Sequence, residues 1–194
     1  MRVAIAVFED AEELDWAGPF QVLATWAGHW PADGVEVLTV ADTAAPIRCA
    51  NGLRVLAEVT WQELGAVDVL VYPGGIGTRR QLGREDIRER LRALADAGTL
   101  MTSVCTGSLV FADAGLLDGR PATTHWASLE LLASLGREID VRADVRYVDD
   151  GDVITAAGVS AGIDVALHLI ARLHSPARAA EVRREIQYDP QPPV

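Results

Sequence analysis

The chain has 194 residues, of which 49% are hydrophobic and 23% are charged, so it is long enough to form one domain with a buried core. Its formal net charge of −11 argues against nucleic acids and anionic membrane surfaces as partners, because both attract basic proteins. No run of about 18 apolar residues occurs and the N-terminus does not resemble a signal peptide, so we expect neither a transmembrane helix nor export.

The sequence contains two cysteines, Cys49 and Cys105, and no CxxC pair. We therefore expect no disulfide framework, and the reduced state suits the cytoplasm. The four histidines are dispersed and give no zinc-type spacing with the cysteines. The sequence thus predicts a cytoplasmic protein without a metal site.

Strand-like and helix-like segments alternate along the chain, which predicts a mostly parallel sheet with helices on both faces. We place residues 1–188 in a single domain of this α/β sandwich and residues 189–194 in an extended Pro-rich tail. Pro19 is expected in the first turn of the first helix. In chain order, the predicted elements are a strand at 3–8, a helix at 15–27, a strand at 35–40, a looser β segment at 48–59, a strand at 67–72, a helix at 84–97, a strand at 100–104, a helix at 106–114, a short strand at 122–124, a helix at 126–135, a hairpin of strands at 145–148 and 153–156, and helices at 160–173 and 176–187.

Ligands bind beyond the carboxyl ends of the strands in sheets of this kind. Three loops are predicted to lie at that edge, namely residues 9–15, 73–77 and 105–107. We therefore expect the functional side chains in these loops.

Cys105 lies where a predicted strand ends and a predicted helix begins. A nucleophile elbow is a sharp turn at such a junction, with small neighbours that relieve crowding, and Ser103 and Gly107 lie two residues before and after Cys105. The N–H groups and dipole of the helix would lower the thiol pKa from about 8.5 and favour a thiolate. Cys105 could equally be a small buried core residue, and we assign Cys49 to packing.

Asp15 is the candidate acidic partner of Cys105, because it follows the first strand at the same edge. Leu14 and Trp16 beside it suggest an apolar environment, which would raise the carboxyl pKa by desolvation. A protonated carboxyl could donate a hydrogen bond to the sulfur and later deliver a proton. The alternative role for Asp15 is a helix N-cap.

Several other residues at this edge have more than one possible role. Pro73-Gly74-Gly75 offers bare backbone that a ligand could approach closely. Thr106 is a pocket hydroxyl or an ordinary first-turn residue, and His125 is structural or lines a pocket. Three aromatic residues either line an apolar pocket or belong to the core: Trp16, Phe20 and Trp126. Three arginines suggest a solvated face, although one could contact an acidic substrate: Arg79, Arg80 and Arg84.

Taken together, these motifs resemble those of one known family. The segments that carry the resemblance are Glu13-Leu14-Asp15-Trp16-Ala17-Gly18-Pro19-Phe20, Tyr72-Pro73-Gly74-Gly75, Ser103-Val104-Cys105-Thr106-Gly107-Ser108-Leu109, Ala114-Gly115-Leu116-Leu117-Asp118-Gly119, Ala122-Thr123-Thr124-His125-Trp126 and Gly158-Val159-Ser160-Ala161-Gly162-Ile163-Asp164. The chain resembles the ThiJ/PfpI superfamily of the class I glutamine-amidotransferase-like fold over nearly its whole length. Within it, the sequence is most similar to the isonitrile hydratase branch.

The resemblance implies a flavodoxin-like three-layer sandwich that forms a homodimer and uses no metal or organic cofactor. It implies Cys105 as the nucleophile and Asp15 as its acidic partner, with a small molecule as substrate. Residues implied in substrate or oxyanion binding are Thr106, Gly74, Gly75, Ile76 and His125. The implied reaction adds water to an isonitrile and gives an N-substituted formamide through a covalent thioimidate.

Other activities of the superfamily are alternatives. A protease-like member carries His after its cysteine, so Thr106 argues against peptide hydrolysis. A glyoxalase-like member carries Glu in the first loop, and the shorter Asp15 favours the isonitrile branch. Another cysteine hydrolase, a glyoxalase or deglycase, a redox or ligand sensor and a non-catalytic binding protein remain alternatives.

Overall fold

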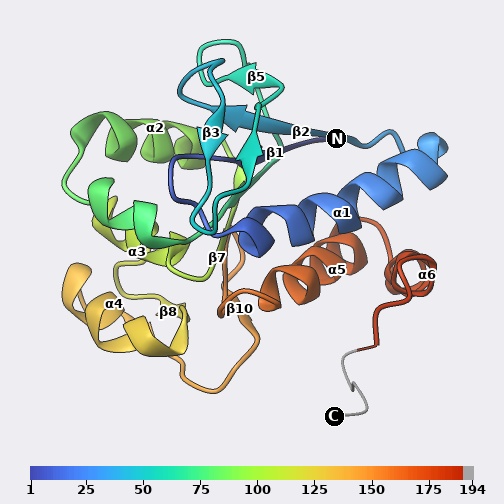
Figure 1. The fold of residues 1–194 in the computed structure, drawn as a ribbon. Coiled ribbons are helices and arrows are strands. Elements are labelled where there is room, and N and C mark those ends of the chain that lie inside the picture. The colour runs from blue at the N-terminus through green and yellow to red at the C-terminus, as the bar shows by residue number, and fades with distance from the viewer. Residues whose placement is uncertain (190–194) are drawn as a thin grey trace.

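A sheet of seven strands forms the centre of the molecule (Figure 1). The computed structural model describes residues 1–189. Every neighbouring pair in this sheet is parallel except the pair of β10 and β11. In spatial order the strands are β10 (Tyr147–Asp149), β11 (Val153–Ala156), β7 (Leu100–Val104), β6 (Val69–Tyr72), β1 (Arg2–Ala6), β2 (Glu36–Ala41) and β5 (Val59–Thr60). The mostly parallel sheet expected from the sequence is confirmed.

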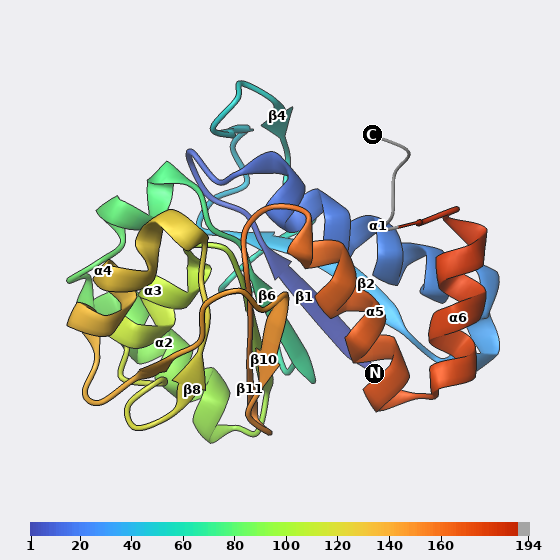
Figure 2. The ribbon, with the colours of Figure 1, turned by 90° about the horizontal axis from the view of Figure 1, so that it is seen from below.

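Helices cover both faces of this sheet, which gives three layers (Figure 2). One face is covered by α1 (Glu13–His29), α5 (Ala161–Leu173) and α6 (Pro176–Glu185). The other is covered by α2 (Glu85–Asp96), α3 (Gly107–Asp113) and α4 (Leu129–Leu135). The predicted α/β sandwich is therefore confirmed.

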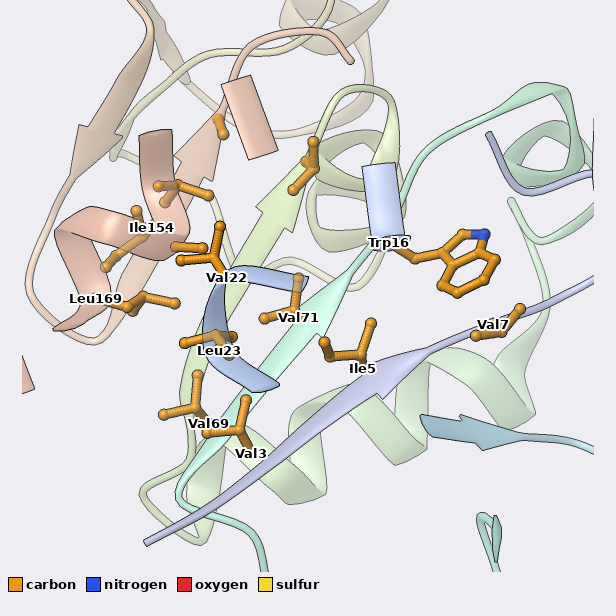
Figure 3. Packing of buried hydrophobic residues seen from close by; sticks show 14 of the residues in the cluster. Val3, Ile5, Val7, Trp16, Val22, Leu23, Val69, Val71, Ile154 and Leu169 are labelled. Carbon is orange, nitrogen blue, oxygen red and sulfur yellow. The ribbon is translucent and has the colours of Figure 1, made fainter. Parts of the chain in front are cut away.

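The residues of β1 show how one strand contributes to both cores. Side chains of a strand alternate between its two faces. Val3 and Ile5, with Val7 directly after the strand, face the core on the side of α1 (Figure 3), whereas Ala4 and Ala6 face the opposite core. All five are almost completely buried, and burial of one Val or Ile side chain stabilises the fold by roughly 1.5–3 kcal/mol.

Two small sheets lie outside the central one. The looser β segment predicted at 48–59 is a hairpin of β3 (Ile47–Arg48) and β4 (Arg54–Val55), followed by β5 at the edge of the central sheet. The short strand predicted at 122–124 ends at residue 122 and is not part of the central sheet. β8 (Pro121–Ala122) pairs with β9 (Asp140–Val141) instead.

The two threonines after β8 explain this difference. Thr123 N donates to Thr155 Oγ1 at 2.9 Å, and Thr124 Oγ1 donates to the carbonyl oxygen of Cys105 at 2.9 Å. Both groups therefore bind the ends of β11 and β7, and they do not extend a strand.

Helix boundaries differ from the predicted ones in two places. α1 begins at Glu13, so Pro19 lies inside the helix and not in its first turn, as the sequence had suggested. The helix predicted at 126–135 begins as the 3-10 turn η3 (Trp126–Ser128) and continues as α4. Two further 3-10 turns are η1 (Pro31–Asp33) and η2 (Ile76–Arg80). Except for Asp189, the Pro-rich tail predicted at 189–194 lies outside the described residues.

Candidate active site

The three loops predicted at the carboxyl edge of the sheet are joined by hydrogen bonds. Glu12 N donates to Gly74 O and Gly77 N donates to Asp10 O, each at 3.0 Å. Gly75 N donates to Thr106 Oγ1 at 3.0 Å, which links the glycine loop to the turn after β7. The loop between β11 and α5, which contains Val159, also reaches this site.

Cys105 occupies a strained turn between β7 and α3. Its φ is +57°, in the left-handed region that costs a non-glycine residue roughly 1–3 kcal/mol. Its N–H donates to the carbonyls of Ala156 and Ala157 at 3.1 and 3.0 Å, and its carbonyl accepts from the hydroxyls of Ser108 and Thr124. The backbone is thus held on both sides, in the conformation expected for a nucleophile elbow.

The neighbouring glycine loop approaches the turn too closely for a side chain. A Cβ on Gly74 would lie 2.5 Å from Thr106 N and 2.9 Å from Asp15 Oδ2. Gly74 N donates to Asp15 Oδ2 at 3.0 Å. Both glycine amides therefore bind site side chains, Gly74 the acid and Gly75 the Thr106 hydroxyl.

Asp15 is fully buried in the first turn of α1. The N-cap of this helix is Glu12, so Asp15 does not cap it and its carboxyl is directed to Gly74. Burial raises the pKa of Asp15 to about 7, although N–H and S–H donors from Gly74, Cys105 and Val159 act in the opposite direction. Within residues 1–189, no donor meets the usual distance and angle limits for a hydrogen bond to Oδ1 of Asp15, which is buried. The carboxyl can therefore hold a proton near neutral pH, as its apolar neighbours predicted.

The thiol of Cys105 differs from the prediction. Burial and then the negative charge of Asp15 raise the pKa of Cys105 to about 12, against the backbone N–H groups of Thr106 and Val159. The prediction of a lowered pKa is wrong for the resting thiol, because it gave the helix more weight than burial. Protonation of Asp15 removes the charge that disfavours the thiolate, so the two groups titrate as a pair.

A cavity of about 270 Å³ gives access to this pair. Cys105 is 5% exposed and lines it, whereas Asp15 is fully buried and does not line it. The lining residues are Glu12, Gly75, Ile76, Arg79, Cys105, Thr106, His125, Ala127, Ser128 and Val159. Of the residues named from the sequence for this site, Gly74 and Asp15 thus lie outside the lining.

His125 and Val159 line both this cavity and a second one of about 380 Å³. Nδ1 of His125 accepts from Ala127 N at 3.3 Å, and the His125 ring lies against Gly158, where a Cβ would be 2.3 Å from the ring. Trp126, 78% exposed, lines the second cavity. Trp16 is buried in the core.

Val159 is a site residue that the sequence analysis did not identify. Its φ is +48°, which is exceptional for a β-branched residue, and its N–H is directed at both Asp15 and Cys105. The only signal was its place at the last strand–helix junction, and no local pattern indicates a left-handed valine.

The described part of the chain offers neither a metal-binding cluster nor a membrane-spanning helix. Among residues 1–189 there is no group of three or more His, Cys, Asp or Glu side chains placed to hold a metal ion. No helix in the same range combines the length and apolarity needed to cross a bilayer.

Known proteins with similar sequences identify the family of this chain. The DJ-1/PfpI family pattern matches residues 1–172. An isonitrile hydratase from Pseudomonas putida is 35% identical over 193 residues, which cover 100% of this chain and 81% of the relative. The HTH-type transcriptional regulator CdhR from Pseudomonas aeruginosa is 31% identical over 159 residues, which cover 82% of this chain and 47% of the regulator.

A solved structure gives the same assignment. The crystal structure of a ThiJ/PfpI family protein from Pseudomonas syringae matches with a TM-score of 0.88 and 30% identity, and the match covers 100% of this chain and 77% of that one. The family suggested by the motifs around Asp15, Gly74 and Cys105 is thereby confirmed, and the chain belongs to the DJ-1/PfpI family.

Proposed function

We propose that this protein is a hydratase that adds water to isonitriles and releases N-substituted formamides, with Cys105 as nucleophile and Asp15 as acid and base. The observation that carries the proposal is the carboxyl of Asp15, which is fully buried beside the thiol and has a pKa raised to about 7. Such a group can give and take a proton at neutral pH. The 35% identity to an isonitrile hydratase over the whole chain supports the choice of substrate class.

In the first step, the sulfur of Cys105 attacks the terminal carbon of R–N≡C. The same carbon takes the proton held by the Asp15–Cys105 pair, and the product is the thioimidate Cys105–S–CH=N–R. The N–H groups of Thr106 and Val159 lower the pKa of the sulfur and so stabilise its anionic form during the attack.

In the second step, Asp15 accepts a proton from water as the water oxygen adds to the thioimidate carbon. Asp15 passes this proton to the substrate nitrogen, which gives the tetrahedral intermediate Cys105–S–CH(OH)–NH–R, and the intermediate then collapses. The C–S bond breaks, R–NH–CHO leaves, and the hydroxyl proton returns to the Asp15–Cys105 pair. The sum of the two steps is R–NC plus water giving the formamide.

The remaining cavity residues are proposed to bind substrate. Thr106 Oγ1 is fixed by Gly75 N and lies beside the nucleophile, so it can position the isonitrile. Ile76 is 62% exposed and offers an apolar contact at the mouth of the cavity. His125 also lines the cavity. Gly74 acts through Asp15, since its N–H orients that carboxyl.

The proposal extends to the state of the enzyme. Nucleophile and proton both come from side chains, so the reaction as written uses no cofactor. We place the protein in the cytoplasm as a homodimer with one domain over residues 1–188.

The decisive experiment is a turnover assay with an aryl isonitrile, methylglyoxal and a peptide amide. Formamide production, followed by NMR, is expected for the isonitrile and should be abolished in Cys105→Ala. Cys49→Ala is the matched control, because Cys49 lies in the core away from the cavity lining. Full isonitrile hydration by Cys105→Ala would contradict the mechanism, and turnover of methylglyoxal alone would favour a glyoxalase.

A cysteine-based sensor is the second candidate, because one relative is a transcriptional regulator. Intact-mass analysis distinguishes it from the hydratase. A transient adduct with the isonitrile supports the hydratase, whereas a stable gain of two oxygen atoms under mild peroxide supports the sensor. The raised pKa of Cys105 argues against easy oxidation of the resting thiol.

A further inference from the structure

We propose that Arg79 binds a carboxylate of the substrate at the mouth of the Cys105 cavity, so that the preferred isonitriles carry an acidic group. This inference rests on the proposed function for the identity of the reacting group. The anion site itself follows from the position and the partners of Arg79.

Arg79 belongs to η2 and lines the same cavity as Cys105 and Thr106. Its Nη1 donates to Thr78 Oγ1 at 3.0 Å, and its Nη2 donates to Ser128 Oγ at 3.2 Å. Ser128 lines the cavity beside Arg79, whereas Thr78 is fully buried and does not line it. The guanidinium is therefore held at the cavity by two neutral hydroxyls, which fix its direction and leave its charge uncompensated.

The adjacent arginines provide a contrast. Arg80 pairs with Asp10 at 2.8 Å, and Arg84 pairs with Asp86. Both line a separate cavity of about 250 Å³. Arg79 forms no ion pair with any carboxylate of residues 1–189, although acidic residues outnumber basic ones by 28 to 17 in the chain. Its positive charge is thus available to a ligand.

The distance from Arg79 to the reacting sulfur suits a small substrate. Thr78 Oγ1, which accepts from Arg79, lies 3.2 Å from Thr106 Oγ1, and Thr106 adjoins Cys105 in the chain. Two hydrogen bonds therefore separate the guanidinium from the hydroxyl beside the nucleophile. An isonitrile carbon at the sulfur and a carboxylate at Arg79 can belong to one short molecule.

The negative charge of Glu12, which also lines the cavity, determines how an anionic substrate is oriented. Glu12 lines the side formed by the first loop, where Asn51 Nδ2 donates to its Oε1 at 3.0 Å. The other titratable groups facing the cavity are Cys105 and His125, whereas Asp15 is fully buried and does not line it. An anionic substituent is repelled by Glu12 and attracted by Arg79, so it points toward Ser128 and η2.

Guanidinium chemistry suits this role. Arginine has five N–H donors in a planar fork that matches a carboxylate, and two of these donors are engaged by Thr78 and Ser128. The free donors can bind both oxygens of an acid. Because Arg79 is exposed to solvent, we expect the lower end of the effect of a charged hydrogen bond, roughly tenfold in affinity.

The first test compares 4-isocyanobenzoate with its neutral amide at low ionic strength. The wild-type enzyme should favour the acid by roughly tenfold in kcat/KM, mainly through KM. Arg79→Gln should abolish this preference, so that the acid and the amide have similar kcat/KM values. Arg80→Gln, which removes an exposed and ion-paired neighbour, should leave the preference unchanged. Equal selectivity in wild type and Arg79→Gln would overturn the inference.

A second test does not depend on isonitrile turnover. Cys105 is alkylated with iodoacetate or iodoacetamide, and the modified peptide is quantified by mass spectrometry. A change in thiol pKa affects both reagents alike. The rate with the anionic iodoacetate divided by the rate with the neutral iodoacetamide therefore reports the charge at the cavity mouth. The ratio should fall severalfold in Arg79→Gln but not in Arg80→Gln. If this ratio falls in Arg79→Gln but the wild-type protein turns over no isonitrile, the proposed reaction is rejected and the anion site is retained. If the ratio is unchanged in Arg79→Gln, the anion site is rejected.

Discussion

Asp15 and Cys105 form a buried acid–thiol pair in which each group controls the ionisation of the other. The charge of Asp15 is the second cause of the raised Cys105 pKa, after burial. A proton on the carboxyl therefore makes the sulfur easier to ionise. This arrangement keeps the thiol neutral at rest and allows a thiolate to form when Asp15 is protonated.

The first prediction separates the two effects of this carboxyl. Asp15→Asn should lower kcat/KM for an aryl isonitrile by roughly 10²- to 10⁴-fold, because the general acid and base is lost. Alkylation of Cys105 by iodoacetamide at pH 7.5 should become faster, because the charge that raises its pKa is gone. A variant that lost both activity and thiol reactivity would indicate a collapsed site.

The second prediction concerns stability and pH. The pKa of Asp15 rises from 3.8 to about 7 on folding, so between about pH 4 and pH 7 the folded chain holds a proton that the unfolded chain has released. The stabilisation from this group is complete below about pH 4 and is lost as the pH rises to 7. The shift corresponds to roughly 4 kcal/mol.

Urea unfolding of wild type and Asp15→Asn measures this effect. The free energy of unfolding of wild type minus that of the variant should decrease from pH 4 to pH 8. Asp113→Asn is the control of opposite sign, because Arg88 holds the pKa of Asp113 below its usual value. For this control, the free energy of unfolding of wild type minus that of Asp113→Asn should decrease only as the pH falls below about 4. Parallel curves for the two variants would refute the assignment.

At this scale, the sequence could identify Cys105 and Asp15 as candidates for the proposed reaction but could not describe their surroundings. Cys105 and Asp15 occur at strand ends with recognisable neighbours, so both could be predicted. The left-handed backbone of Val159 and the bond from Thr124 to the Cys105 carbonyl depend on segments that meet only in the fold. Burial of the sulfur could not be read locally, and that is why the direction of its pKa shift was mistaken.

Among the elements, α1 links the site to the core, since Asp15 lies in its first turn and its later turns pack on α5. Two glycines of this helix face different surroundings. A Cβ on Gly18 would lie 3.2 Å from Ile163 Cγ1 of α5, whereas nothing lies within 4 Å of a Cβ on Gly28. Gly18 therefore allows close helix packing, and Gly28 has no such role.

The third prediction follows from this difference. Gly28→Ala should stabilise the protein by about 0.5 kcal/mol, because alanine loses less backbone entropy in a helix and the site lies in the last turn. Thermal unfolding should show a Tm increase of roughly 1–2 °C. Gly18→Ala is the matched control and should give no increase, since Ile163 has to move. An equal gain in both variants would contradict the packing argument.

Long elements were easier to predict than short ones. Buried apolar strands such as β6 and β7 can be recognised in the sequence as continuous runs of apolar residues. β9 has only two residues, in a charged stretch, and no alternation reveals it. The pairing of β8 with β9 could not be read from the sequence, because β8 also has only two residues.

For the whole molecule, alternation of strands and helices was enough to predict three layers. The position of β5 beside β2 and the separate hairpin of β3 and β4 required the structure, because one irregular segment contributes to both. The assignment of residues 1–188 to one domain stays a prediction.

An apolar surface next to this hairpin bears on assembly. Leu53 and Leu56 are 51% and 61% exposed, and Leu14 of α1 is 39% exposed. Leu53 N donates to Glu13 Oε1 at 3.3 Å, so the hairpin and the start of α1 are adjacent. Exposed apolar groups that cluster in this way are typical of protein interfaces.

The fourth prediction is that this surface forms the proposed homodimer. Light scattering after size exclusion should give the mass of two chains, and Leu56→Asp should shift the protein toward one chain. Leu173→Asp, at an exposed leucine on α5, is the control and should leave the dimer intact. A wild-type monomer would refute the dimer, and disruption by Leu173→Asp alone would refute its location.

The turn at Cys105 also has a consequence for protein synthesis. Its N–H is held by the carbonyls of Ala156 and Ala157, at the end of the strand that completes this side of the sheet. While the ribosome still holds that strand, these two backbone hydrogen bonds cannot form. The turn at Cys105 is therefore anchored on this side only when residues beyond 157 have left the exit tunnel, and a chain truncated before that point never acquires the anchor.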